Sequence, residues 1–386
     1  MDINNLIKET TIVYDLKEEK EVFWVNPEYG KKAVLPVDQA DIFDAEARFQ
    51  RFAPYFKEEF PETTQSNGIL ESPLTPIPKM KEAVTKFEHY SLTGNVYLKE
   101  DNKLPISGSI KSRGGIYEVL KFAEQVAIES GMLTYMDNYS ILRESKFHKL
   151  FSNYGVSVGS TGNLALSIGI VAAHLGFQVT VHMSHDAKKW KKDLLRAKGV
   201  NVIEYPGSFT SAITAGRKKA AEDPKMYFID DEGSYDLFLG YSVSAIRLQK
   251  QLKDQNIQVD KDHPLFVYLP AGVGGSPSGV SFGLKTILGE NVHPIFAEPT
   301  HIPSVLLGMA TGLNDKISVY DIGLDGLTEA DGLAVGRPSR IAGKIMKTLL
   351  LGIGTFEDAR VLAYTAQLWD TENIKVEPSA TGVLLP

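Results

Sequence analysis

The chain has 386 residues, a length that suits two domains or one large α/β unit. Its 41 lysines and arginines against 48 acids give a net charge of −7, which argues against a surface built for nucleic acid. The absence of cysteine excludes disulfides and thiolate nucleophiles. No apolar run approaches the ~20 residues of a membrane span, and the N-terminus lacks the pattern of a secretory signal, so we expect a cytoplasmic protein with no membrane partner.

The first 95 residues or so are irregular and rich in charge, aromatics and proline, with expected helices around 39–52 and 78–89. From Val96 onward, short β-rich runs alternate with helical stretches. Strands are expected at 96–99, 156–158, 178–183, 200–205, 226–229, 265–269 and 293–297. Helices are expected at 115–129, 164–175, 187–198, 211–221, 237–252 and 279–288.

This alternation predicts a mainly parallel sheet covered by helices on both faces. Ligands of such folds bind at the carboxyl ends of the strands, where loops meet helix N-termini. Three loops of this chain are rich in glycine and serine, and all three fall at junctions that lead into helices. They are therefore the first places to look for chemistry.

The first loop, Ser107–Gly115, carries a lysine among small residues at the start of a helical stretch. A helix N-terminus disfavours the ammonium form of Lys111, and an uncharged amine is a nucleophile toward carbonyls. The small residues allow a flat ring and a phosphate to approach the backbone. This pattern suits a covalent bond to pyridoxal phosphate, although a lone lysine after a turn is more often a surface residue.

The second loop is Ser160-Thr161-Gly162-Asn163, between an expected strand and an expected helix. Its N–H groups and hydroxyls can hold a carboxylate, with support from the helix dipole. The amide of Asn163 can hydrogen-bond a phenolic oxygen. The same residues are also those with which helices commonly begin, so capping is the favoured interpretation of this loop taken alone.

The third loop, 270–279, follows an apolar strand and holds Gly272-Val273-Gly274-Gly275-Ser276. Successive small residues form a concave set of N–H donors that suits a phosphate dianion. Pro277 lacks an N–H group and interrupts the turn that a dinucleotide-binding motif requires. There is also no G-x-x-x-x-G-K-[ST] motif for a nucleoside triphosphate. The alternative reading is a tight strand-to-helix turn.

Taken together and in this order, the three loops resemble the tryptophan-synthase-β class of pyridoxal-phosphate enzymes, fold type II. Longer stretches are similar to the D-serine dehydratase (D-serine ammonia-lyase) family. They are Arg51–Tyr55, Ser107–Lys111, Val158–Leu164, Phe228–Glu232, Phe238–Val243, Phe296–His301 and Asp331–Gly336. The resemblance extends from about residue 20 to about residue 380.

The resemblance implies an α/β fold with two doubly wound, mainly parallel sheets and a cofactor cleft between a large and a small domain. We expect the large domain at about 1–104 plus 236–386 and the small domain at about 105–235. The implied activity is a pyridoxal-phosphate-dependent carbon–oxygen lyase reaction that converts D-serine, and also D-threonine, by β-elimination. The resemblance also implies a monomer that acts on a small amino acid.

The family pattern implies roles for individual residues of this chain. Lys111 would bind the cofactor and move protons, Asn163 would contact its 3′-oxygen, and Ser160, Thr161 and Gly162 would cradle the substrate carboxylate. The backbone of Gly272, Val273, Gly274, Gly275 and Ser276 would hold the phosphate. Asp230 or Asp231 would lie near the substrate side chain. Glu298 would bind a monovalent cation, K⁺ or Na⁺, or would be an ordinary strand-end carboxylate.

The chain departs from the family pattern in two places. Ala271, Ser276 and Ser278 stand where the family usually has Cys, Gly and Gly. The family also continues after Glu377-Pro378-Ser379-Ala380 to a later Ala-Thr-Gly-Gly element, whereas Pro386 is the last residue here. Three explanations are open. Ala380-Thr381-Gly382 could replace that element, the partner of the ring nitrogen could be missing, or further residues could follow. We favour the last explanation and name Thr381 as the pyridine partner.

Other activities remain open at this stage. An L-serine or L-threonine dehydratase, or a racemase, would keep the fold and the cofactor. A protein that binds the cofactor without catalysis, and a plain nucleotide-binding α/β protein, are further alternatives. His174, His182 and His185 have no metal-ligand spacing with acids, and we interpret them as ordinary core or surface residues. The basic run Lys188–Lys192 is interpreted as a solvated helix face.

Overall fold

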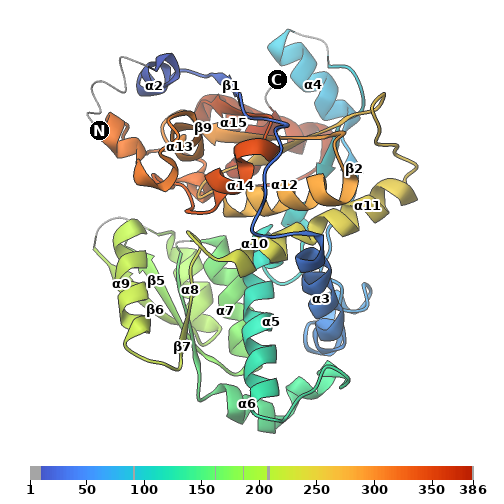
Figure 1. The fold of residues 1–386 in the computed structure, drawn as a ribbon, viewed down its shortest axis with the longest axis vertical. Coiled ribbons are helices and arrows are strands. Elements are labelled where there is room, and N and C mark those ends of the chain that lie inside the picture. Colours follow the sequence, from blue (N-terminus) through green and yellow to red (C-terminus); the bar gives the residue numbers. More distant parts are fainter. Residues whose placement is uncertain (1–9, 90–91, 161, 186, 207–208, 385–386) are drawn as a thin grey trace. The chain divides into compact units, whose positions relative to one another are not determined.

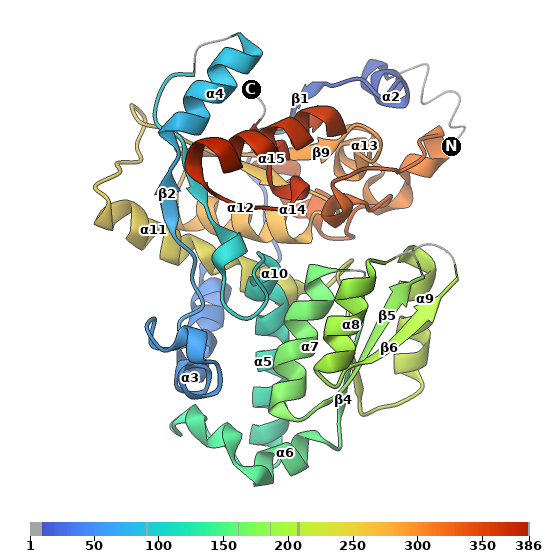
Figure 2. The same ribbon diagram turned by 180° about the vertical axis from the view of Figure 1, so that it is seen from behind.

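The computed structural model describes residues 10–89, 92–160, 162–185, 187–206 and 209–384. The chain divides into two compact units, each built from separate segments. The first unit comprises Met1–Asp38, Pro73–Asn102 and Ser244–Pro386, and the second comprises Gln39–Ser72 and Lys103–Val243. Figures 1 and 2 show the ribbon from two opposite sides.

The division places residues 39–72 in the second unit, whereas the sequence analysis expected them in the large domain. The reason is the packing of helix α3 (Gln39–Glu59) against α5 (Lys111–Glu129). The ring centroids of Phe49 and Tyr117 lie 5.5 Å apart. Nε of Arg48 donates to the buried Glu124 carboxylate at 2.8 Å. A buried pair of this kind ties an N-terminal helix to the lysine-bearing helix.

The first unit contains a four-stranded sheet in the order β1-β10-β9-β8. Strands β8, β9 and β10 are parallel, and β1 is antiparallel at the edge. The strands are β1 (Phe23–Val25), β8 (Leu265–Pro270), β9 (Val292–Pro299) and β10 (Gly352–Phe356), with a separate antiparallel pair, β2 (Leu74–Pro76) and β3 (Tyr97–Lys99). The helices are α2 (Thr11–Lys17), α4 (Pro78–Glu88), α11 (Ser244–Asp254), α12 (Gly275–Leu288), α13 (Ser304–Ala310), α14 (Ala342–Leu349) and α15 (Asp358–Glu372).

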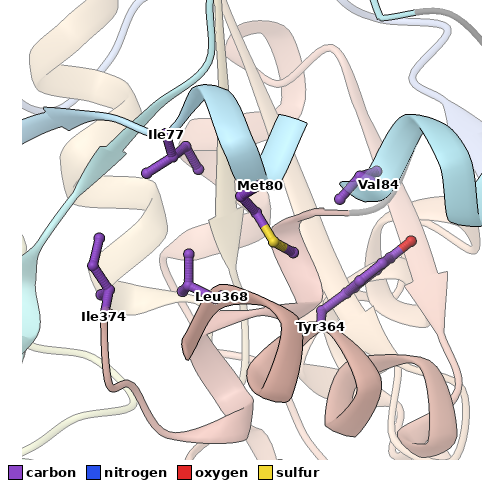
Figure 3. Close-up of a cluster of buried hydrophobic side chains, with 6 residues drawn as sticks. All are labelled: Ile77, Met80, Val84, Tyr364, Leu368 and Ile374. Carbon is purple, nitrogen blue, oxygen red and sulfur yellow. The ribbon is translucent and has the colours of Figure 1, made fainter. Parts of the chain in front are cut away.

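Helix α4 packs against α15 through a cluster of buried apolar side chains, shown in Figure 3. The cluster consists of Ile77, Met80, Val84, Tyr364, Leu368 and Ile374. The backbone N–H of Met80 donates to the Glu372 carboxylate at 2.9 Å, which satisfies one of the unpaired donors at the start of α4. The contact therefore combines apolar burial with a helix cap.

The second unit contains a four-stranded, fully parallel sheet in the order β6-β5-β4-β7. Its strands are β4 (Gly155–Gly159), β5 (Gln178–Ser184), β6 (Asn201–Tyr205) and β7 (Met226–Ile229). Its helices besides α3 and α5 are α6 (Ser145–Phe151), α7 (Asn163–Leu175), α8 (Lys189–Ala197), α9 (Phe209–Ala221) and α10 (Tyr235–Ser242). Helices α7 and α9 pack on the strands, and α5 packs against α7 and α10.

The predicted alternation of strands and helices is confirmed, although several helices begin or end at other residues than expected. Helix α5 begins at Lys111 and α12 begins at Gly275, each four residues earlier than expected. The helix expected over 237–252 is two helices, α10 and α11, and the first unit resumes at the break between them. No helix in the described part of the chain is long and apolar enough to cross a membrane.

Candidate active site

Lys111 is the first residue of helix α5, in the second unit. Its backbone N–H faces the Ser109 hydroxyl at 3.3 Å, and the hydroxyls of Ser107 and Ser112 lie 2.6 Å apart. Gly108 has a φ of +62°, a conformation that glycine adopts without a steric cost. The serines and the glycine therefore shape the turn that delivers the lysine to the helix start.

Ile106, at the entry to this loop, has a φ of +78°. Positive φ is a genuine outlier for a β-branched residue and costs about 1–3 kcal/mol. A hydrogen bond from the Ser107 N–H to the Pro105 carbonyl at 3.0 Å closes a three-residue turn around Ile106. The lysine loop therefore starts from a strained backbone, which no sequence pattern had indicated.

The side chain of Lys111 lies over an aromatic ring. Its Nζ is 5.6 Å from the centroid of the Tyr241 ring, a distance typical of a cation–π contact. Tyr241 belongs to α10, and glycines on both helices permit this approach. A Cβ on Gly114 would lie 2.5 Å from the Tyr241 ring, and one on Gly240 would lie 2.7 Å from the Arg113 carbonyl oxygen. The small residues hold the two helices close together.

Two neighbouring aspartates, Asp230 and Asp231, follow strand β7. Nη2 of Arg217 donates to the Asp230 carboxylate at 2.8 Å and to the Glu232 carboxylate at 2.9 Å. Asp231 is instead close enough to Lys111 for the charge of the ammonium to act on it. Burial raises the pKa of Asp231, the Lys111 charge lowers it, and the neighbouring Asp230 and Glu232 raise it. Asp231 is therefore a candidate acid for chemistry at Lys111.

A third acid, Glu118, was missed by the sequence analysis. It lies seven residues after Lys111 on α5, hence on a similar face of the helix, and it is buried. The hydroxyl of Ser234 donates to Oε2 at 2.6 Å and the hydroxyl of Tyr227 donates to Oε1 at 2.9 Å. Burial raises the pKa of Glu118 to about 8, although these two hydrogen bonds lower it. Glu118 thus anchors the segment that carries Asp231.

The second predicted loop lies between β4 and α7, and α7 begins at Asn163. The Ser160 hydroxyl accepts from the N–H groups of Gly162 and Ala165, both at 3.3 Å. Since Ala165 is in the first turn of α7, the capping interpretation holds for Ser160. Thr161 lies outside the described residues. The loop is therefore at a helix N-terminus, as a carboxylate site requires.

The third loop is shorter than predicted, because α12 begins at Gly275. Gly274 has a φ of +92°. The Gly272 carbonyl accepts from the Ser304 hydroxyl at 3.2 Å, and the Val273 carbonyl accepts from the Ser339 N–H at 2.7 Å. Within the described residues, the N–H groups of Gly272, Val273, Gly274 and Gly275 donate to no protein acceptor, although all four residues are buried. Buried N–H donors without acceptors fit a phosphate group.

Side chains are excluded from this loop by close packing. A Cβ on Gly272 would lie 3.0 Å from Cα of Leu333, and one on Gly274 would lie 3.0 Å from the Val305 side chain. Pro277 occupies the first turn of α12, where its missing N–H breaks no helical hydrogen bond. The hydroxyl of Ser278 is buried without a hydrogen-bond partner in the described part of the chain. Donors thus remain available for a bound anion.

Glu298 and Thr381 lie in the first unit, each with contacts inside the protein. The Glu298 carboxylate accepts from the N–H groups of Val305 and Leu306, both at 2.8 Å, and burial raises its pKa to about 8. The buried hydroxyl of Thr381 lies 2.8 Å from that of Thr365, with backbone carbonyl oxygens 3.0 Å away. These hydrogen bonds have a structural role. The cation contact of Glu298 and the pyridine contact of Thr381 stay predictions.

Two of the histidines singled out from the sequence contact hydroxyl or carboxylate side chains. No group of three or more metal-ligating side chains occurs among the described residues. His182 is buried between the hydroxyls of Tyr205 and Ser157, at 2.9 and 3.0 Å, and burial lowers its pKa to about 4. His174 lies 2.8 Å from the Glu59 carboxylate. These contacts are structural.

Comparisons with known proteins show the family to which the chain belongs. The family described as "Pyridoxal-phosphate dependent enzyme" matches residues 66–385. The "Probable D-serine dehydratase" of Pediococcus pentosaceus is 65% identical over 382 residues, which cover 99% of this chain and 88% of the relative. That of Lactiplantibacillus plantarum is 61% identical over 382 residues, with the same coverage. Both alignments include the lysine loop and the glycine loop.

A solved structure shows the same fold at low sequence identity. Diaminopropionate ammonia lyase from Escherichia coli superimposes with a TM-score of 0.73 at 16% identity, over 95% of this chain and 85% of that protein. The fold is therefore fold type II. The chain belongs to the family of pyridoxal-phosphate dependent enzymes, and within that family to the group named probable D-serine dehydratases.

Proposed function

We propose that this enzyme catalyses the β-elimination of D-serine to pyruvate and ammonia, and that it converts D-threonine to 2-oxobutanoate and ammonia. The observation that carries the proposal is the identity of 55–65% over at least 99% of the chain to proteins named probable D-serine dehydratase. The placement of Asp231 beside Lys111 supports it, because elimination of water needs both a base and an acid.

Pyridoxal phosphate, when bound, stabilises the negative charge that develops at Cα of an amino acid as the α-proton leaves. In the proposal, Nζ of Lys111 binds the cofactor covalently and the Asn163 amide contacts its 3′-oxygen. The buried N–H groups of residues 272–276 hold the phosphate, with support from the N-terminus of α12. Thr381 is proposed as the partner of the ring nitrogen.

The acid and the base of the elimination come from the second unit. Nζ of Lys111 is released from its covalent bond when the amine of the substrate takes its place, and it then accepts the α-proton as the Cα–H bond breaks. The carboxyl of Asp231 then protonates the departing β-hydroxyl, the Cβ–O bond breaks and water leaves. A carboxyl whose pKa is raised by burial suits this role, because it retains its proton at a higher pH. The released enamine hydrolyses in water to pyruvate and ammonia.

The Ser160–Gly162 loop is proposed to hold the α-carboxylate of the substrate, with Thr161 included from the sequence. An anion at this point benefits from the N-terminus of the 13-residue helix α7. Holding the carboxylate fixes which face of Cα presents its proton to Lys111. This loop is thus the proposed origin of stereochemical preference.

Three finer statements belong to the same proposal. Glu298, whose buried carboxylate already accepts two N–H groups, is proposed to lie beside a monovalent cation, K⁺ or Na⁺. The enzyme is proposed to be a monomer in the cytoplasm, in keeping with a chain free of cysteine. Its proposed partner is the amino-acid substrate, with no nucleic acid and no membrane.

The test mixes the purified protein with pyridoxal phosphate and either enantiomer of serine. We expect the visible absorbance of the lysine-bound cofactor and pyruvate formation from D-serine, with far less from L-serine. Pyruvate from L-serine at an equal or higher rate would contradict the stereochemistry. Interconversion of the enantiomers without pyruvate would indicate a racemase. Absorbance without any turnover would indicate a protein that binds the cofactor but does not catalyse a reaction. D-threonine is tested by assaying 2-oxobutanoate.

A further inference from the structure

The basic run before and within helix α8 is not a uniformly solvated face. The side chain of Lys189 is 87% exposed, as a solvated face predicts. Lys191 and Lys192 are only 5% and 7% exposed. The helix has no acid in its first turn, although acids are the residues that the helix dipole favours there. Lys191 also lies near an aromatic ring, with its Nζ 5.5 Å from the centroid of Trp190.

The three lysines of α8 differ in their surroundings. Lys189 pairs with Asp193, four residues later on the exposed side of the helix. Lys192 donates to the Glu204 carboxylate and to the His185 carbonyl, both at 2.7 Å. The side chain of Lys191 lies near Gly162: its Nζ is 3.2 Å from the position that a Cβ on Gly162 would occupy. The ammonium of Lys191 is therefore beside the Ser160–Asn163 loop.

The topology explains how this lysine reaches the loop. Strands β4 and β5 are parallel neighbours, with Gly159 paired to His182. The segments that follow the two strands therefore emerge at the same edge of the sheet. The segment after β4 leads to Gly162 and α7, and the segment after β5 leads to α8, which packs against α7. A side chain from the first turn of α8 thus approaches the start of α7.

From this geometry we propose that Lys191 is a substrate-binding residue that recognises the α-carboxylate of the amino acid. The inference rests on the proposed function of the Ser160–Gly162 loop. The loop lies at the start of α7, where the helix dipole favours an anion, and Lys191 supplies a full positive charge beside Gly162. A charge held in a buried position discriminates strongly between a carboxylate and a neutral amide. Because Gly162 has no side chain, the ammonium of Lys191 can approach the backbone of the loop closely.

The test measures binding separately from turnover. D-alanine carries the α-amine and the carboxylate but no β-hydroxyl, and D-alaninamide replaces the carboxylate by a neutral amide. Both are titrated into the pyridoxal-phosphate-loaded protein and followed by calorimetry. We expect Lys191→Met to weaken D-alanine binding about 10- to 100-fold, the size of a lost charge-assisted hydrogen bond, and to leave D-alaninamide binding within about twofold. The KM for D-serine rises in parallel, whereas kcat changes little.

Lys189→Met is the matched control, since it removes a lysine from the same turn on the exposed side and should leave both affinities unchanged. Lys191→Arg keeps the charge and should keep most of the affinity for D-alanine. If Lys191→Met does not fold, Lys191→Gln provides the neutral variant. Equal losses for D-alanine and D-alaninamide would overturn the proposal, as would a wild-type protein that binds both ligands equally.

The two proposals can fail separately. A wild-type protein that produces no pyruvate from D-serine contradicts the proposed function. Carboxylate-dependent binding of D-alanine that is lost in Lys191→Met would still establish the role of Lys191. Conversely, D-serine turnover with an unchanged KM in Lys191→Met would leave the function intact and exclude this lysine.

Discussion

The lysine region of the second unit and the glycine loop of the first unit solve binding problems in opposite ways. Around Lys111, the groups proposed to act are side chains: an amine, the Asp231 carboxyl and the Tyr241 ring. In the glycine loop, the groups proposed to bind are the backbone N–H donors of Gly272–Gly275, and close packing leaves no room for a side chain at Gly272 or Gly274. A moving proton needs a titratable side chain, whereas a fixed phosphate charge needs only oriented dipoles.

The two regions should therefore be sensitive to different kinds of substitution. In the lysine region, a substitution that preserves shape but removes a titratable group should abolish chemistry and spare the fold. In the glycine loop, the addition of a single methyl group should impair binding although no functional group is lost. Both expectations can be broken by experiment.

The largest effect is expected for Lys111→Ala. Because the same Nζ binds the cofactor and accepts the α-proton in the proposed reaction, turnover should fall by at least ~10³-fold. Pyruvate formation and the circular dichroism spectrum are measured together, and the fold should be retained. Lys111→Arg, which keeps the charge but not the nucleophile, should be equally inactive. Substantial activity in either variant would remove the lysine from the chemistry.

The next effect separates the two aspartates. Asp231→Asn removes the acid beside Lys111 and should lower kcat by about 10²-fold. Asp230→Asn is the matched control. It disturbs the ion pair between Arg217 and Asp230, and because this pair is partly exposed, little activity should be lost. Steady-state kinetics on D-serine provide the measurement. A reversed order would mean that Asp230 is the proton donor.

In the glycine loop, Gly274→Ala should weaken pyridoxal-phosphate binding about tenfold. Its Cβ would meet Val305 at 3.0 Å and Ala342 at 3.1 Å, in a backbone conformation with φ of +92°. Gly323→Ala is the control, since Gly323 has a similar backbone conformation, with a φ of +94°, but no atom within 4 Å of the added Cβ. Both variants carry the backbone penalty of about 1 kcal/mol, so only the loop contact differs. Equal cofactor affinity in the two variants would argue against the phosphate role.

The smallest effect concerns the buried acid that anchors the Asp231 segment. The pKa of Glu118 is raised from 4.5 to about 8 in the folded protein, so the folded state keeps a proton that the unfolded chain loses. Its contribution to the free energy of unfolding is complete below about pH 4.5 and is lost as the pH rises to about 8, with a slope of up to about 1.4 kcal/mol per pH unit. Urea unfolding of wild type and Glu118→Gln across this range measures the difference.

Glu129→Gln, at the exposed end of the same helix, is the control for that experiment. Its free energy of unfolding should follow that of the wild type at every pH. A difference between wild type and Glu118→Gln that is independent of pH would show that Glu118 stays ionised in the folded protein.

Much of the site could be predicted from the sequence because its signals are local. The three loops are marked by runs of glycine and serine beside strands, and the structure places all three at helix starts. The family resemblance then assigned roles that neighbouring residues alone left ambiguous. The parallel sheets followed from the alternation of strands and helices.

What the sequence did not predict depends on distant contacts. The contacts of Arg217, on α9, with Asp230 and Glu232 are of this kind, because no local pattern indicates them. The burial of Lys191 depends on the pairing of β4 with β5. The signal for Glu118 was present as a seven-residue spacing from Lys111, but its burial comes from partners more than 100 residues away.

The central claim is that Nζ of Lys111 forms the covalent bond to pyridoxal phosphate. The most direct measurement is borohydride reduction of the loaded protein, followed by proteolysis and mass spectrometry of the labelled peptide. The account predicts one stable pyridoxyl label on Lys111 and no label in Lys111→Ala. A label on a different lysine of the wild-type protein, or none at all, would contradict it.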